Sequence, residues 1–578
     1  MTEVVTAIDV WPARAQYRPG EPIGLRVAIK GTSPGSLLLR TRIVQADGTL
    51  TITDSSIVDP GVSNDPAELV FHLPLGAAAG YAAEVVAETD RGALRATTAF
   101  DVAPHWSAAP RYGFFSDFTP EETVDESNRR ADHLLRLHVN VVQFYDWMAS
   151  HHTFLPETDE FTDPLGRRLS HEVVRRKVAL AHERGMASLA YGALYGAEAE
   201  FSREHPDWLL YDGRHEPLAL ADIFYLQDFG PRSPWREWIV GQYEQAVDVL
   251  GFDGIHIDQY GYPKSALSRL SGRWRTFDVG AAFPGFVEEA ASRILKRRPE
   301  GGSIFNCVNA WPLEAMAPVR SDAATYIEVW EPHTRYRDLY DLVRRARLLR
   351  PDKQVILAAY LLPFHPDTQR TAGALTAFRL ASAAIGASGG FHLISGEGAA
   401  LLSEAYYPRH GQLDQAEAAV VRRYADFAVR NTGLLHGPAT TDIAWTHVGP
   451  TNDVIVLSHP DLDAYGAGAQ PGSLWVIGRE LGDVTVLQLV NLRGLTTDAW
   501  NTAQERGPSP LTSVEVRVRV VGGIAGVWFD TPDDDVGLAR PVPFDVTNTA
   551  AGRFLVFRIP RIDVWSTVWW KTEQGGQA

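Results

Sequence analysis

The chain has 578 residues, of which 45% are hydrophobic and 22% are charged, and it carries a net charge of -17 at neutral pH. This length exceeds what one hydrophobic core supports, so we expect several domains. The acidic excess argues against nucleic acid as a partner, and the sequence has no run of eighteen apolar residues that would predict a membrane span. The single cysteine, Cys307, excludes an internal disulfide and a cysteine-rich zinc site.

The first ten residues, MTEVVTAIDV, lack the basic stretch and the apolar core of a secretory signal. We therefore expect either a cytoplasmic protein or the mature form of a secreted one.

The first hundred residues read as short alternating strands separated by turns that contain Gly, Pro and Asp. This pattern is typical of a β-sandwich. The segment at 103–110, which contains Ala, Ser and Pro, reads as a connector. We therefore predict a first domain, a β-sandwich, over residues 1–104.

A different periodicity begins near Arg111, where short apolar strands alternate with amphipathic helices. Before the fourth strand, apolar residues recur at helical spacing: Ile239, Tyr243, Ala246 and Leu250. The eight strands read RYGFFSD, NVVQFYD, MASLAYG, FDGIHID, GSIFNCV, AATYIEV, KQVILAAY and GFHLIS. Eight strands alternating with helices predict a (β/α)8 TIM barrel over residues 105–436, with an open, doubly wound sheet as the alternative.

From about Gly437 the pattern returns to strands, among them DVIVLSH, VTVLQLVNL and SVEVRVRVV. We predict a C-terminal β-sandwich over residues 437–578. The expected architecture is therefore multidomain, with a central barrel between two β-sandwiches.

In barrels of this kind, catalytic groups lie at the carboxyl ends of the strands, where the loops gather. Polar residues that end or follow an apolar strand are therefore the candidates. This filter leaves eight positions: Asp117, Asp146, Tyr191, Asp258, Asn309, Glu328, Tyr360 and Glu397. The sequence has no histidine pair with zinc spacing and no glycine-rich phosphate loop, so we expect no metal and no cofactor.

Asp258 and Glu328 are the best catalytic pair among these positions. Asp258 ends a buried strand, and a rigid strand holds a carboxylate in the fixed orientation that a nucleophile needs. Glu328 shares a strand face with Tyr326 and Trp330, and partial burial beside rings raises a carboxyl pKa as an acid/base requires. Glu331, in the following loop, is the weaker alternative. An acidic residue at a barrel rim can also cap a helix or pair with an arginine, so residue types alone do not decide.

Other residues near the strand ends are candidates for sugar binding, because rings stack on sugars while carboxylates and amides bind paired hydroxyls. They are Tyr145, Asp146, Trp147, Tyr191, His256, Asn309, Trp330, Tyr360 and Tyr407. Each could instead be part of the packed core, and for His256 the two interpretations carry equal weight. The adjacent His151 and His152 are expected to be loop residues rather than metal ligands.

Six motifs follow one another along the chain: QFYDWMASHH at 143–152, FTDPLGR at 161–167, GFDGIHIDQYG at 251–261, FNCVNAW at 305–311, YIEVWE at 326–331 and LLSEAYYPRHG at 401–411. In this order they resemble glycoside hydrolase family 66, the dextranases and cycloisomaltooligosaccharide glucanotransferases. The resemblance implies an immunoglobulin-like β-sandwich before the barrel and a second sandwich after it, where VLQLVNLRGLTTDAW at 486–500 is similar to a family stretch.

By this resemblance, Asp258 matches the nucleophile of the family and Glu328 its acid/base. The implied activity is retaining, endo-acting hydrolysis of an α-1,6-glucan partner, dextran or isomaltooligosaccharides, through a glycosyl-Asp intermediate. Gln259 and Tyr260, which follow the nucleophile, depart from the small Thr-hydrophobic pair of some members, which bears on the linkage preference.

Three alternatives to hydrolysis of α-1,6-glucan stay open. Cyclising members of the family carry a carbohydrate-binding module inserted near the seventh strand, whereas here Val355 and Phe391 leave room for one helix, so cyclisation is second to hydrolysis. A related α-glucan hydrolase with another linkage preference is the second alternative. A non-catalytic glucan-binding protein is the third, and the presence of both carboxylates argues against it.

Overall fold

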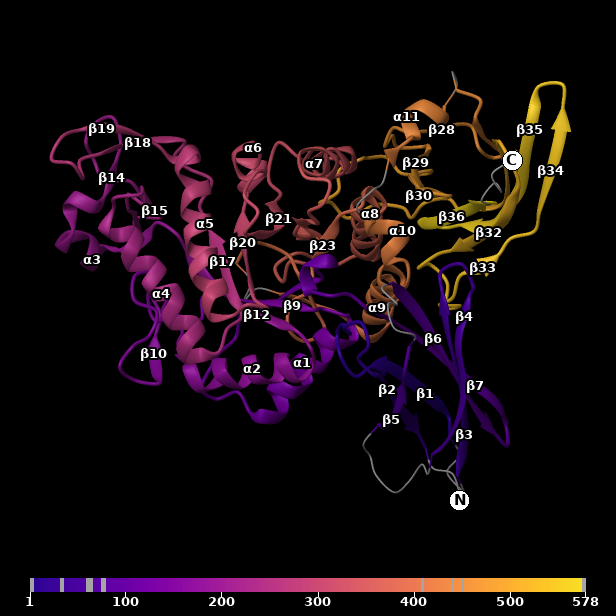
Figure 1. Cartoon of the computed structure of the whole chain (residues 1–578), viewed down its shortest axis with the longest axis horizontal. Coiled ribbons are helices and arrows are strands. Elements are labelled where there is room, and N and C mark those ends of the chain that lie inside the picture. Colours follow the sequence, from indigo (N-terminus) through magenta and orange to yellow (C-terminus); the bar gives the residue numbers. More distant parts are fainter. Residues whose placement is uncertain are drawn as a thin grey trace.

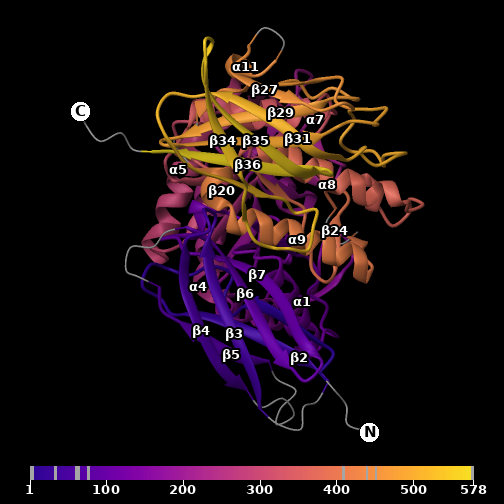
Figure 2. The same cartoon turned by 90° about the vertical axis from the view of Figure 1, so that its right-hand side faces the viewer.

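The computed structural model describes residues 5–31, 36–58, 66–73, 79–406, 410–437, 441–449 and 452–573. The barrel occupies the left and centre of Figure 1, and two groups of β-sheets, from the start and the end of the chain, lie one below the other at its right side. The view turned by 90° shows the same stacking of the yellow C-terminal sheets over the indigo N-terminal ones (Figure 2).

The N-terminal region forms two antiparallel sheets. One contains β1 (Ala7–Pro12), β2 (Ile23–Lys30) and β5 (Ala67–Phe71), and the other contains β4 (Leu50–Val58), β3 (Leu37–Gln45), β6 (Gly80–Thr89) and β7 (Gly92–Asp101), in these orders. Alternate residues of both sheets, such as Leu25, Leu39 and Val85, meet in one buried apolar cluster. The predicted strand content of this region is confirmed.

The central region is an eight-stranded parallel barrel. Its strands are β8 (Tyr112–Phe115), β9 (Val141–Phe144), β12 (Ala187–Ala193), β17 (Gly254–Asp258), β20 (Gly302–Asn306), β21 (Asp322–Glu328), β22 (Val355–Ala358) and β23 (Phe391–Leu393). They pair in chain order, and a parallel bridge between Gly113 and Ser395 brings the first and last strands together. All eight predicted strands are confirmed, and the doubly wound alternative is wrong, because strand order never reverses as it does in that fold.

Helices follow the strands on the outside of the barrel. The long ones are α1 (Val124–Arg136), α2 (His171–Glu183), α4 (Pro234–Leu250), α5 (Val279–Arg297), α7 (Tyr336–Leu349), α8 (Ala372–Ser388) and α9 (Gln415–Arg430). In α4, Ser233 caps the first turn ahead of Pro234, and Gly251 ends the helix in the left-handed conformation at φ 84°. The four apolar residues predicted at helical spacing in α4 are all buried.

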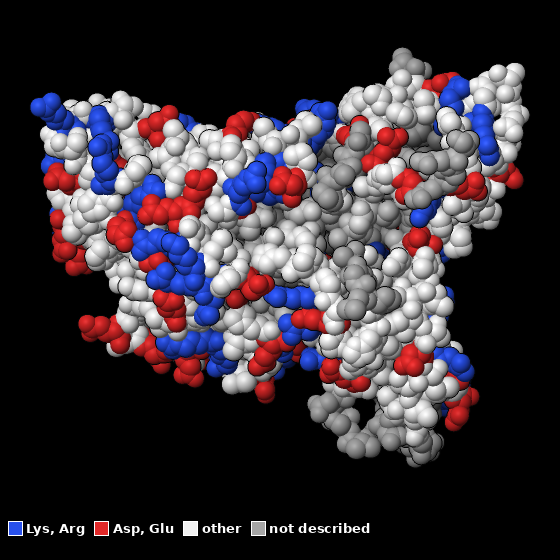
Figure 3. Space-filling model, viewed as in Figure 1, with Lys and Arg blue, Asp and Glu red and all other residues white. Residues whose placement is uncertain are grey.

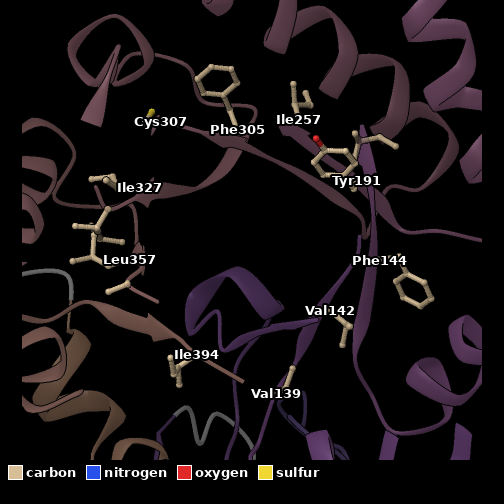
Figure 4. Close-up of a cluster of buried hydrophobic side chains, with 14 of the residues drawn as sticks. Val139, Val142, Phe144, Tyr191, Ile257, Phe305, Cys307, Ile327, Leu357 and Ile394 are labelled. Carbon is tan, nitrogen blue, oxygen red and sulfur yellow. The ribbon is translucent and has the colours of Figure 1, made fainter. Parts of the chain in front are cut away.

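Alternate residues of each barrel strand face opposite ways. Outward-facing residues, such as Ile257, Phe305 and Leu357, pack with the helices in the main buried cluster (Figure 4). Inward-facing residues fill the barrel, where the rings of Tyr112, His256 and Tyr326 contact one another. The barrel is therefore closed by a layer of aromatic rings below the ends of its strands.

Two small sheets enlarge the loops after β12 and β17. One contains β13 (Gly196–Glu198), β16 (Phe224–Leu226) and β15 (Ala219–Leu220), and the other β14 (Leu210–Tyr211), β18 (Ser265–Ser268) and β19 (Arg275–Asp278). They form the upper left end of the molecule in Figure 1. The sequence indicated enlarged loops but not that these loops contain sheets.

The C-terminal region again forms two sheets. The larger includes β29 (Leu474–Leu481), β30 (Val484–Asn491), β36 (Trp565–Thr572) and β32 (Ile524–Asp530), and the smaller contains β27 (Ile455–Ser458), β31 (Leu511–Arg519), β35 (Gly552–Ile562) and β34 (Phe544–Thr549). Residues of both sheets, among them Leu489, Val516 and Leu555, share one buried cluster.

Charged side chains of both signs cover the visible face of the molecule. On the face shown in Figure 3, acidic and basic side chains are interspersed. Among the described helices, none combines the length and apolar character needed to cross a membrane.

A buried ion pair joins the barrel to the C-terminal sheets. The guanidinium of Arg430 in α9 donates to both carboxylate oxygens of Asp530 in β32, at 2.7 and 2.9 Å, and Asn431 donates to the same carboxylate at 2.7 Å. Both charged side chains are almost completely buried. Loss of one partner would leave an uncompensated charge in a medium of low dielectric constant.

We expect Arg430→Ala to destabilise the protein by about 3–5 kcal/mol, because Asp530 stays buried without its counter-ion. Thermal unfolding followed by circular dichroism checks this, with Arg558→Ala as the matched control, since Arg558 pairs with Glu515 on the exposed surface. An Arg430→Ala variant that melts with the control would contradict the role of this pair.

Candidate active site

Asp258 and Glu328 occupy equivalent places in the barrel. Asp258 is the last residue of β17 and Glu328 the last of β21, and both face inward because they lie two positions beyond the inward-facing His256 and Tyr326. Both line one cavity of about 400 Å³ at the carboxyl ends of the strands. The structure thus brings the two predicted acids together at the mouth of the barrel.

Hydrogen bonds fix the two carboxyl groups. The hydroxyl of Tyr191 donates to Asp258 Oδ2 at 3.0 Å, and the hydroxyl of Tyr360 donates to Glu328 Oε1 at 2.9 Å. Between them, the Nδ2 group of Asn306 donates to Asp258 Oδ1 at 2.8 Å and to Glu328 Oε2 at 3.1 Å. Each acid thus accepts from one tyrosine of its own and from the amide that the two acids share. The Trp330 side chain also hydrogen-bonds to Glu328, and the backbone of Gln259 to Asp258.

The shared amide limits the separation of the acids. Because the bonds of 2.8 Å and 3.1 Å start from the same Asn306 nitrogen, Asp258 Oδ1 and Glu328 Oε2 lie at most 5.9 Å apart, the two lengths laid end to end. If the two bonds follow the N–H directions of a planar amide, the oxygens are about 5 Å apart.

Burial and mutual repulsion affect the protonation of the pair. Burial raises the pKa of Asp258, and the nearby Glu328 charge raises it further, to about 7, against hydrogen bonds from Asn306 and Tyr191 that lower it. Burial also raises the pKa of Glu328. Two such groups titrate as one unit, and the pair holds a single proton over a range that reaches neutral pH.

The end of β9 forms a second wall of the cavity. Tyr145 packs edge-on against Tyr191 with ring centroids 5.1 Å apart, and Asp146 lines the cavity next to it. The Asp146 carboxylate lies 3.7 Å from the guanidinium of Arg167 and 4.0 Å from the ring of His151. This wall therefore offers an aromatic face and an acid that lies between the Arg167 guanidinium and the His151 ring.

His151 and His152 both contact Glu198, the last residue of β13. Burial lowers the pKa of His151, but the Glu198 and Asp146 carboxyls outweigh it and raise the pKa above its usual value. Among the described residues, no group of three His, Cys, Asp or Glu side chains is placed to hold a metal ion.

Two predicted binding residues lie on the sixth strand's side of the site. Trp330 lines the cavity, is 42% exposed, and packs against Tyr360 with centroids 5.8 Å apart. Asn309 does not line the cavity; its side chain accepts from the Trp330 backbone and donates to the Glu331 carbonyl. Asn309 thus supports the loop that carries the exposed ring, and Glu331 lies in that loop rather than in the cavity.

The remaining predicted binding residues differ in their outcome. Trp147 is fully buried behind the cavity, where its indole donates to the Tyr191 carbonyl at 3.1 Å. His256 lies at the cavity floor, bonded to the Tyr112 hydroxyl at 2.8 Å, and burial lowers its pKa to about 3, so its ring is neutral. Tyr407 lies outside the described residues.

The structure adds cavity residues that the sequence analysis did not select. They include Gln143, Leu165, Leu220, Phe224, Val308 and, most centrally, Asn306. The signal for Asn306 was available, since it lies two positions after the apolar Ile304 on the inward face of the fifth strand. Leu220 and Phe224 come from the sheet inserted after β12 and carry no such signal.

Comparisons with known proteins agree with these features. The profile described as glycosyl hydrolase family 66 matches residues 12–569. A cycloisomaltooligosaccharide glucanotransferase of Niallia circulans is 27% identical over 374 residues, which cover 61% of this chain and 38% of that protein. A dextranase of Streptococcus salivarius is 21% identical over 549 residues, which cover 82% of this chain and 65% of that protein. The chain thus spans less than two thirds of these relatives' length.

A solved structure is similar over its whole length. The cycloisomaltooligosaccharide glucanotransferase of a Paenibacillus species, in complex with cycloisomaltoheptaose, superposes with a TM-score of 0.86 at 20% identity, covering 98% of this chain and 99% of that one. At this identity the likeness shows a common fold. Because the family profile runs through the barrel and both flanking groups of sheets, as the order of the motifs predicted, the chain belongs to glycosyl hydrolase family 66.

Proposed function

We propose that this protein is a retaining, endo-acting hydrolase of α-1,6-glucan, such as dextran or isomaltooligosaccharides. The observation that carries the proposal is the carboxyl pair at the barrel mouth, whose Asn306-linked oxygens are at most 5.9 Å apart. In retaining glycosidases the two carboxyl groups are about 5–5.5 Å apart. In inverting glycosidases they are about 6.5–9.5 Å apart, because a water molecule must fit between the sugar and one of them. The limit set by Asn306 supports the retaining class.

In the first step, an Asp258 oxygen attacks the anomeric carbon while Glu328 gives its proton to the leaving glycosidic oxygen. The C–O bond to the leaving chain breaks as the bond to Asp258 forms, which yields a β-glucosyl ester. In the second step, Glu328, now ionised, takes a proton from water, and the water oxygen displaces Asp258. The α configuration returns because the carbon is inverted twice.

The mechanism requires one proton on the pair, held by Glu328. The raised pKa values keep one proton on the pair near neutral pH. Asp258 accepts hydrogen bonds from Asn306 and Tyr191, and Glu328 accepts a matching pair from Asn306 and Tyr360, so these bonds stabilise a negative charge on either acid. Bound substrate assigns the shared proton to Glu328, because the leaving glycosidic oxygen accepts a hydrogen bond from that acid.

The cavity walls fit a short stretch of glucan. Trp330 presents a partly exposed ring, and Tyr145 presents a second ring beside the pair. Asp146 supplies an oriented carboxylate for paired hydroxyls. The names of the relatives, a dextranase and glucanotransferases that form cyclic isomaltooligosaccharides, support an α-1,6-linked substrate.

Hydrolysis is proposed ahead of cyclisation because of the connection between β22 and β23. A short 3-10 helix at Leu362–Phe364 and α8 account for the ordered elements between Ala358 and Phe391. No further module lies in this described stretch. The connection therefore adds no second sugar-binding surface that could return a chain end to the site.

We further propose three domains, with limits at residues 1–104, 105–436 and 437–578. The two N-terminal sheets that share one apolar cluster support an immunoglobulin-like sandwich, and the two C-terminal sheets support a second sandwich.

Substitution of either acid should abolish hydrolysis. Asp258→Asn should lower kcat on dextran about 1,000-fold or more, because no ester forms, and Glu328→Gln should lower it about 10²- to 10⁴-fold. Reducing-sugar release measures both, and proton NMR of the first wild-type product should show the α anomer.

Azide distinguishes the roles of the two acids. With Glu328→Ala, azide should accept the glucosyl group from Asp258 and give an α-glucosyl azide, whereas the same reagent with Asp258→Gly should give the β anomer. Initial β products from the wild type would rule out retention, and a wild type as inactive as Asp258→Asn on every α-glucan would favour the binding-protein alternative.

The rate should fall as pH rises through about 7. Above this value the pair loses its last proton, so Glu328 can no longer protonate the leaving oxygen. At low pH the rate should also fall, because Asp258 then becomes protonated. A kcat/KM profile for an isomaltooligosaccharide measures both limbs, and a profile that stays flat from pH 6 to pH 9 would contradict the shared proton.

The products of dextran digestion should be mainly linear. Chromatography with mass spectrometry separates linear oligosaccharides from cyclic ones, which are lighter by one water. A majority of cyclic products would make the glucanotransferase alternative the correct one.

A further inference from the structure

Asn306 is the one side chain among the described residues that hydrogen-bonds to both Asp258 and Glu328. It ends β20, between the strands that carry the two acids, since β20 pairs with β17 on one side and β21 on the other. The side chain is 4% exposed. Its position therefore follows from the strand order and not from a movable loop.

The geometry uses the full donor capacity of the amide. A primary amide has two N–H groups in one plane, and here one points to Asp258 Oδ1 and the other to Glu328 Oε2. Its Oδ1 atom has no hydrogen-bond partner in the described part of the chain. The reverse orientation would set the Oδ1 lone pairs against two acceptors, so the acids fix the orientation of the amide.

The backbone of Asn306 is also held. Gln259, which is 1% exposed, donates its side-chain amide to the Asn306 carbonyl at 3.1 Å and accepts from the Gly261 N–H at 2.6 Å. Gln259 directly follows the nucleophile, so the ends of β17 and β20 are connected by this side chain as well as by the sheet. Asn306 is thus linked to the strand of Asp258 through its backbone as well as through its side chain.

The double displacement moves one negative charge between the two acids. Before the first step the charge is on Asp258; in the ester intermediate Asp258 is neutral and Glu328 carries the charge. An N–H donor stabilises the charged form of its acceptor. Because Asn306 has one N–H on each acid, it stabilises the charge in both places without reorienting, and preorganised donors of this kind lower barriers in partly buried sites.

We propose that Asn306 is a positioning residue of the reaction: it holds the two carboxyl groups at the spacing of the double displacement and stabilises the negative charge first on Asp258 and then on Glu328. This inference rests on the proposed function. It adds a third residue to that function. This residue contacts both acids but not the substrate atoms at which bonds break and form.

Two variants of Asn306 and one control test the inference. Asn306→Ala removes both donors, and Asn306→Asp keeps the shape of the side chain but replaces the donating nitrogen with an oxygen. Ser303→Ala is the control, because Ser303 is a buried polar residue of the same strand that does not line the cavity. Thermal melting of all three variants shows whether they fold. If Asn306→Ala does not fold, the inference is tested with Asn306→Asp.

Both Asn306 variants should lower kcat on an isomaltooligosaccharide about ten- to a hundredfold, with little change in KM, because hydrogen bonds to charged groups are lost at the reacting pair and not at the sugar. Both limbs of their pH profiles should move to higher pH, since the loss of donors raises both carboxyl pKa values. Ser303→Ala should match the wild type. Asn306 variants with wild-type kcat, or with reduced kcat and unmoved limbs, would overturn the inference.

A second measurement does not depend on catalysis. The infrared carbonyl band of protonated carboxyl groups, identified by its loss in Asp258→Asn and Glu328→Gln, reports the titration of the pair directly. In Asn306→Ala this band should persist to higher pH than in the wild type. If the wild type cleaves no glucan, the proposed function fails and the role of Asn306 in the reaction fails with it, while a shifted band still supports the stabilisation of the ionised pair by Asn306. An unshifted band overturns the inference whether or not the wild type is active.

Discussion

Alternation along the eight parallel strands of a nearly closed barrel is the constraint on which the site depends. In a strand every second residue faces the barrel interior, and in a parallel barrel the carboxyl ends of all strands open to the same side. Asp258, Asn306 and Glu328 are the last inward-facing residues of three neighbouring strands, β17, β20 and β21. Their hydrogen bonds therefore follow from register, and a slip of one residue in any of these strands would turn its polar group toward the helices.

The layer below the acids explains their protonation. The rings of Tyr112, His256 and Tyr326 close the barrel under the site, and His256 is neutral because burial lowers its pKa to about 3. On this side the acids therefore face packed rings that carry no positive charge. A carboxyl pair in such surroundings retains a proton at a pH where an exposed pair has lost both. The aromatic floor thus supports the acid role proposed for Glu328 without touching a substrate.

The sequence predicted the strands, the barrel and the site of the acids, because each depends on local periodicity. It missed Asn306 and selected Asn309 instead, although Asn306 follows the inward-facing Ile304 by two residues; counting positions along the strand would have found it. Trp147, by contrast, was selected as a sugar-binding residue, whereas the structure buries it behind the cavity. It has the same parity as Tyr145, but Asp146 adopts φ 46°, in the left-handed region, and the chain turns so that the indole enters the core.

Residues supplied by inserted loops could not be predicted in this way. Leu220 and Phe224 reach the cavity because β15 and β16 pair with β13, and Phe224 packs on His151 with ring centroids 4.1 Å apart. That pairing joins segments whose sequences show no shared pattern, so their meeting depends on the tertiary fold. The pattern of one strand fixes which way a residue faces, whereas the walls of the cavity depend on how loops pack on one another.

This division separates the chemistry of the site from its specificity. In the proposed mechanism, the pair linked by Asn306 transfers a glucosyl group from Asp258 to any hydroxyl that Glu328 can deprotonate, whether of water or of a sugar. Which acceptor arrives is decided by the walls, among them Trp330 on its exposed loop and the inserted β13–β16 sheet. Hydrolases and glucanotransferases can therefore share one barrel and one carboxyl pair, and the difference between them is to be sought in the loops around the pair.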